Sequence, residues 1–131
     1  MSAYDTAVNL ATTRHLLLEA EICRSLASVA LALITRAIHH IETAEMLLVD
    51  GTADDCRKAT DAIKAAEDDV VRALATRKMF NDPTYLELRL AREALATDLY
   101  VSHLYYTPVH RDAAKEHLHE AAFQISQGLP R

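Results

Sequence analysis

Residues 26–48 read LASVALALITRAIHHIETAEMLL, and the fold class follows from the spacing of their apolar side chains. Apolar residues recur every three or four positions, which places them on one face of an α-helix. The same spacing runs through the first fifty residues as one stripe, whose members are Val8, Ala11, His15, Leu18, Ile22, Leu26, Val29, Leu33, Ala37, Ile41, Ala44 and Leu48. No glycine or proline interrupts it, so we predict one long helix over about residues 3–49.

Helix-breaking residues are scarce and divide the rest of the chain. The breakers are Gly51, Pro83, Pro108, Gly128 and Pro130. They separate the segments 1–50, 51–82, 83–107 and 108–131. Thr52 precedes Asp55 by three positions, a spacing typical of a helix N-terminus, and a proline suits the first position of a helix. We expect the two glycines to adopt the left-handed conformation that ends many helices.

Each later segment carries its own helical stripe. The stripe residues are Cys56, Ala59, Ile63, Ala66, Val70 and Leu74, then Leu88, Ala91, Leu95 and Leu99, then Ala114, Leu118, Ala121 and Ile125. Aromatic residues make up only 5% of the chain and tryptophan is absent, which disfavours a sheet. We therefore predict an all-α protein, an antiparallel helical bundle of four main helices with a long first helix, in a single domain over residues 1–131.

The predicted helices differ in length, and a bundle prefers matched lengths. The first would span roughly 70 Å and the second roughly 40 Å. Three arrangements would resolve this difference. The first helix could break near Thr12 or Ser25, or the last two could run nearly collinear across Pro108. Alternatively, the first helix could extend beyond the other helices as an overhang. We favour an overhang that pairs with a second copy, because the apolar run at residues 26–34 is wider than one stripe.

The predicted homodimer requires an interface of apolar and aromatic side chains. Its predicted residues are Leu26, Val29, Leu33, Tyr100, Tyr105 and Tyr106. The three tyrosines gather near the end of one helix, and aromatic rings with polar tips are common at interfaces. The alternative is that they close one end of the bundle.

Charge and cysteine usage narrow the classes of partner and the location. The chain carries 14 Lys and Arg against 19 Asp and Glu, which disfavours nucleic acid and membrane surfaces as partners. The uncharged run from Ser25 to Thr35 is far shorter than the roughly 20 residues of a membrane span. Cys23 and Cys56 lack metal-binding spacing, and the first residues lack a signal-peptide pattern. We expect a cytoplasmic protein with reduced thiols.

Seven histidines make metal binding one alternative. Glu116 and His119 form a Glu-x-x-His motif that resembles the metal-binding motif of ferritin-like di-iron bundles. That resemblance implies a metal site in which both side chains point into the bundle. Those bundles use two such motifs and two further glutamates, whereas this chain has one motif. The other interpretation is that the histidines are solvated or hydrogen-bonded.

Arg111 and His117 form a second candidate pair on the same segment. The stretch RDAAKEH, residues 111–117, resembles the Arg-x₄₋₆-His signature of HEPN-type ribonucleases. The resemblance implies a small, dimeric, all-α ribonuclease that uses no metal. His117 would then act as general acid or base, and Arg111 would stabilise charge on the phosphate. The alternative is that both side chains lie on the solvent-exposed face of the last helix.

The sequence as a whole favours binding over catalysis. Only two glycines are present, and their positions leave no phosphate-binding loop. No complete catalytic set is visible. We therefore expect a non-enzymatic interaction or regulatory module that acts through its helix faces as a homodimer, binds another protein and needs no cofactor. The ribonuclease and the metal-binding bundle are the two alternatives.

Overall fold

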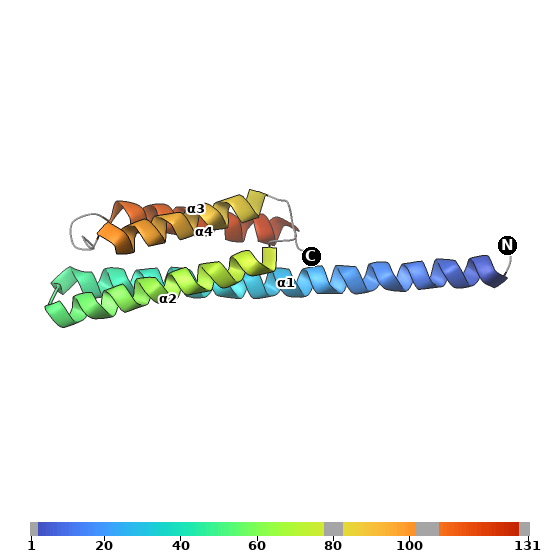
Figure 1. Cartoon of the computed structure of the whole chain (residues 1–131), viewed down its shortest axis with the longest axis horizontal. Helices are drawn as coiled ribbons and strands as arrows, with labels where there is room; N and C mark the ends of the chain where they lie inside the picture. Colours follow the sequence, from blue (N-terminus) through green and yellow to red (C-terminus); the bar gives the residue numbers. More distant parts are fainter. Residues whose placement is uncertain (1–2, 78–82, 102–107, 129–131) are drawn as a thin grey trace.

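The computed structural model describes residues 3–77, 83–101 and 108–128, and these residues are almost entirely helical. The helices are α1 (Ala3–Asp50), α2 (Ala53–Arg77), α3 (Pro83–Val101) and α4 (Val109–Gly128) (Figure 1). The described ranges contain no strand. The prediction of an all-α protein is therefore confirmed.

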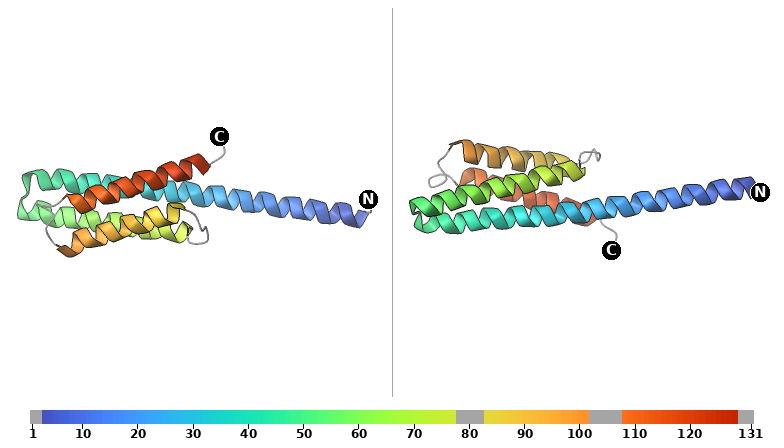
Figure 2. Two further views of the ribbon diagram at one scale, coloured as in Figure 1. Left: turned by 90° about the horizontal axis from the view of Figure 1, so that it is seen from above. Right: turned by 60° about the horizontal axis from the view of Figure 1, so that its bottom comes forward.

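The helices pack against one another, and neighbouring helices run in opposite directions. α1 lies against α2 and α4, and α3 lies against the same two helices (Figures 1 and 2). Each described helix runs antiparallel to both of its neighbours. Since each helix brings one apolar face to the centre, this arrangement encloses a single core.

α1 is unbroken over its 48 residues and extends far beyond the other helices. α2 and α4 both end beside the middle of α1, so that its N-terminal half projects away from the bundle (Figures 1 and 2). The structure thus adopts the overhang, not a break near Thr12 or Ser25. α3 and α4 lie side by side, so they are not collinear across Pro108.

Most residues of the core are predicted stripe residues of the described helices; Ala27, Ala30, Ile34 and Ala73 are core residues outside the stripes. The fully buried large members of the core are Ile34, Ile41, Ile63, Val70, Leu88, Leu95 and Leu118. Burying one such side chain contributes roughly 1.5–3 kcal/mol to stability. Alanines fill the spaces between them and allow the helices to approach closely. In α1 the described buried residues begin only at Ala27, which marks where the bundle starts.

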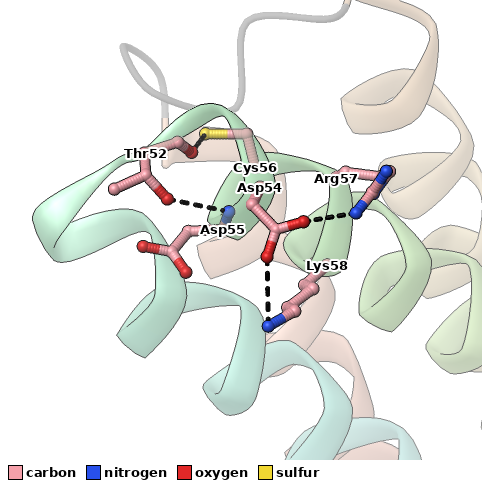
Figure 3. A network of polar contacts seen from close by, with 6 residues as sticks. All are labelled: Thr52, Asp54, Asp55, Cys56, Arg57 and Lys58. Atoms are coloured by element: carbon pink, nitrogen blue, oxygen red, sulfur yellow. Dashed lines mark hydrogen bonds and ion pairs between the residues drawn. The ribbon is translucent and has the colours of Figure 1, made fainter.

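The turn between α1 and α2 follows the predicted chemistry (Figure 3). Gly51 has a φ of 43°, a left-handed conformation in which a side chain is strained. The backbone N–H of Asp55 donates to Oγ1 of Thr52 at 3.1 Å, so Thr52 caps α2 as expected. The Sγ of Cys56 donates to the carbonyl oxygen of Thr52 at 2.8 Å.

Charged residues complete the first turn of α2. Asp54 pairs with Arg57 and, at 3.2 Å, with Nζ of Lys58 (Figure 3). A carboxylate in the first turn also interacts favourably with the helix dipole. These contacts are solvent-exposed and help to fix where α2 begins.

Proline predicts the start of α3 correctly, whereas glycine does not predict the conformation at the end of α4. Pro83 is the first residue of α3, as expected for a proline that needs no hydrogen-bond partner. Gly128 is the last residue of α4 and lies within the helix, so the prediction of a left-handed glycine there is wrong. Within the described ranges, no helix combines the length and the apolar character that crossing a membrane requires.

Candidate functional site

The projecting part of α1, residues 3–25, is the most unusual surface of the molecule, and we call it the arm. Every arm side chain that the structure describes is exposed. Its large apolar residues are each 57–60% exposed; they are Leu10, Leu16, Leu17, Leu18 and Ile22. Contiguous apolar surface of this kind is rare on monomers and marks interaction sites.

The exposed arm poses an energetic problem for an isolated chain. A helix in water gains little from its own hydrogen bonds, and most helical stability comes from packing an apolar face. The described arm residues pack against no other helix. Leu16, Leu17 and Leu18 are consecutive and therefore spread around more than half of the helix circumference. The arm thus offers apolar contacts on several sides to whatever covers it.

A shallow hollow of ≈ 290 Å³ lies on the surface of the arm. Its lining residues are Arg14, Leu17, Leu18 and Glu21. They stand at positions i, i+3, i+4 and i+7 of one helix. In coiled coils, four residues of one helix form the hole that receives a side chain of the facing helix. The hollow has leucines at its centre and opposite charges at its ends.

The predicted interface residues lie in different environments. Leu26 is partly buried where the arm meets the bundle, and Val29 is 49% exposed. Leu33 is buried in the core of its own chain. Tyr100 is 90% exposed near the end of α3. Tyr105 and Tyr106 lie outside the described residues.

Arg111 and Asp98 form a buried ion pair between α4 and α3. Nη1 of Arg111 lies 3.3 Å from Oδ1 and 3.5 Å from Oδ2 of Asp98. Their residues are 4% and 2% exposed, respectively. Nε of Arg111 is also buried and has no hydrogen-bond partner among the described residues. The expectation that Arg111 lies on the solvent-exposed face is therefore wrong, since its guanidinium is buried and pairs with the carboxylate of Asp98.

Burial dominates the electrostatics of this pair. The loss of solvent raises the pKa of Asp98 above its ordinary value, while Arg111 and, more weakly, His110 act in the opposite direction. The carboxylate is thus only partly compensated by its partner. A buried ion pair of this kind stabilises a fold less than apolar side chains of similar volume would.

His117 is held by a different helix partner. Its Nδ1 lies 2.7 Å from Oε2 of Glu87 on α3, and both side chains are half-buried. Arg111 and His117 are six positions apart, which places them about 120° apart around α4. They contact different carboxylates, and the described structure does not bring them together. A phosphate could reach Arg111 only by separating it from Asp98.

The candidate metal ligands lie on the surface. Glu116 and His119 are both exposed on α4. Among the described residues, no three His, Cys, Asp or Glu side chains lie close enough together to hold a metal ion. The structure therefore supplies no further ligands for the Glu-x-x-His motif within the part of the chain that it describes.

The structure also shows polar contacts between helices that the sequence did not indicate. Asp69 of α2 is buried and faces α1, where Oδ1 lies 3.7 Å from Nη2 of Arg36 and Oδ2 lies 3.5 Å from Nε2 of His40. Nζ of Lys115 donates to Glu45 at 2.9 Å, which links α4 to α1. Asp69 follows Ala66 by three positions and therefore occupies a stripe position, a signal that could have identified it.

A further contact joins α3 to α4. Thr84 is buried, and its Oγ1 donates to Oε1 of Gln124 at 3.1 Å. Together with the ion pairs, this bond links neighbouring helices of the bundle. None of these contacts involves a residue of the arm.

Comparison with known protein families, with curated proteins and with solved structures gives no match for this chain.

Proposed function

We propose that this chain is a non-enzymatic interaction module that works as a homodimer through the exposed faces of its helices. The observation that carries the proposal is the arm, whose large apolar side chains are more than half exposed. The antiparallel bundle then serves as a rigid base that holds the arm in position. The buried ion pair of Arg111 and Asp98 supports this assignment, since it gives Arg111 a structural role.

The proposal includes a second protein partner and a cytoplasmic location. Tyr100 offers an exposed aromatic ring away from the arm, and such rings are enriched in protein interfaces. The cytoplasmic location rests on the sequence, in which Cys23 and Cys56 stand far apart and lack metal-binding spacing.

Sedimentation equilibrium of the full chain in reducing buffer tests the homodimer. We expect the wild type to have the mass of two chains at micromolar concentration. Leu17→Glu places a charge in the centre of the arm and should yield monomers. Leu86→Glu is the matched control, because Leu86 is similarly exposed (55%) but lies on α3; it should remain dimeric. A monomeric wild type would refute the proposal.

A further inference from the structure

We infer that the partner is a second copy of this chain whose arm packs antiparallel along the arm of the first. Each arm then covers exposed leucines of the other. This inference rests on the proposed homodimer and specifies its geometry.

The first argument is the continuity of the α1 stripe. The stripe crosses the arm and the bundle half of α1 without interruption, yet its burial changes along the helix. Leu18 and Ile22 are exposed, Leu26 is partly buried, Val29 is 49% exposed and Leu33 is buried. The change falls beside the end of α2, at Arg77 (Figure 1). The apolar residues of the arm therefore have no described helix of their own chain to cover them.

The second argument is the direction in which α2 runs. α2 lies antiparallel to α1, and its Asp69 reaches Arg36 and His40 on α1. A partner arm that is also antiparallel to α1 would run in the same direction as α2. It would place the two bundles at opposite ends of the paired arms. The bundles then do not compete for the same space.

The third argument is charge complementarity at the hollow. Arg14 and Glu21 stand at its two ends, with Leu17 and Leu18 between them. A two-fold axis between the two leucines sets Arg14 of each chain against the partner's Glu21, which gives two attractive pairs. A parallel pair in register would set the two copies of Arg14, and the two copies of Glu21, at the same level. Charges of this kind determine orientation in paired helices.

The fourth argument is the amount of surface. The chain exposes 8566 Å² of accessible surface. A compact monomer of 14.6 kDa exposes about 6,900 Å², so the extended shape adds about 1,700 Å². A stable interface buries about 800 Å² on each partner. Docking along the arm can therefore supply the area that a stable dimer needs.

Charge reversals at the two ends of the hollow test the orientation. The variants are Arg14→Glu, Glu21→Arg and the double substitution, with Arg92→Glu on the exposed face of α3 as control. In an antiparallel dimer each single change turns two attractions into two repulsions, and the dissociation constant should rise by about tenfold or more. The double substitution exchanges the charges and should restore the wild-type constant. The control should leave it unchanged.

Sedimentation equilibrium in reducing buffer measures the dissociation constants, and circular dichroism checks that every variant keeps its helix content. Restoration by the double substitution is specific to the antiparallel pairing. If the wild type is dimeric but the double substitution does not restore the dissociation constant, the antiparallel geometry is wrong and the homodimer stands. If the wild type is monomeric, both the geometry and the proposed function are wrong.

Discussion

Replacing Arg111 by methionine should strongly destabilise the bundle. Methionine has a similar length, so the change removes the positive charge and leaves Asp98 buried without its partner. The charges lie 3.3 Å apart, a separation at which their attraction is about 5 kcal/mol for an effective dielectric constant of about 20. Breaking a buried pair in this way typically costs about 3–5 kcal/mol.

Protonation of Asp98 limits how much stability the Arg111→Met variant loses. A carboxyl with an unfolded-state pKa of 3.8 can take up a proton near pH 7 for about 4 kcal/mol, so the destabilisation should not exceed this amount. We therefore expect Arg111→Met to lower the free energy of unfolding by about 3–4 kcal/mol near neutral pH. The loss should be smaller near pH 4, where protonation is easier.

Urea denaturation followed by far-ultraviolet circular dichroism measures this change. The double variant Asp98→Asn with Arg111→Met leaves no buried charge at the pair, and it should regain most of the lost stability. If Arg111→Met unfolds at the same urea concentration as the wild type at neutral pH, Arg111 is not the buried partner of Asp98. The ribonuclease alternative would then regain its candidate residue.

Three further predictions concern the pH dependence, the turn and the core. Because burial raises the pKa of Asp98, the wild type should lose stability relative to Asp98→Asn as the pH rises from below 3.8 through the folded-state pKa; the opposite trend in parallel urea titrations would mean that the pKa is lowered. Gly51→Ala should cost about 1 kcal/mol in the same assay, since alanine is strained at a φ of 43°, and an unchanged midpoint would argue against the left-handed turn. Ile63→Ala should cost about 2–5 kcal/mol, and a thermal unfolding temperature equal to that of the wild type would place Ile63 outside the core.

The sequence predicted the helices well because their signals are local. Apolar spacing identifies the inner face of each helix, and glycine, proline and Thr52 mark where helices begin or end. Ile63, Leu88 and Leu118 occupy predicted stripe positions and are fully buried. Gly128 shows the limit of these signals, because a glycine near a chain end can also continue the helix.

The polar contacts between helices were harder to predict because they depend on how separate helices align. Asp98 follows Leu95 by three positions, and Arg111 precedes Ala114 by three. Both therefore extend an apolar stripe by one step, and their charges are opposite. This combination is a usable signal for a buried ion pair. The link between His117 and Glu87 has no comparable signal, since both side chains lie at the edge of the helix interface.

The arm shows why a stripe predicts burial but not the partner. The spacing of apolar residues is the same in both halves of α1, so the sequence carries no mark at Ala27, where the bundle begins. The boundary lies beside the end of α2, which the structure describes as far as Arg77. Residues beyond that point retain a pattern that is stable only when covered. The proposed homodimer rests on this apolar surface without an intramolecular partner and on the self-complementary charges of Arg14 and Glu21.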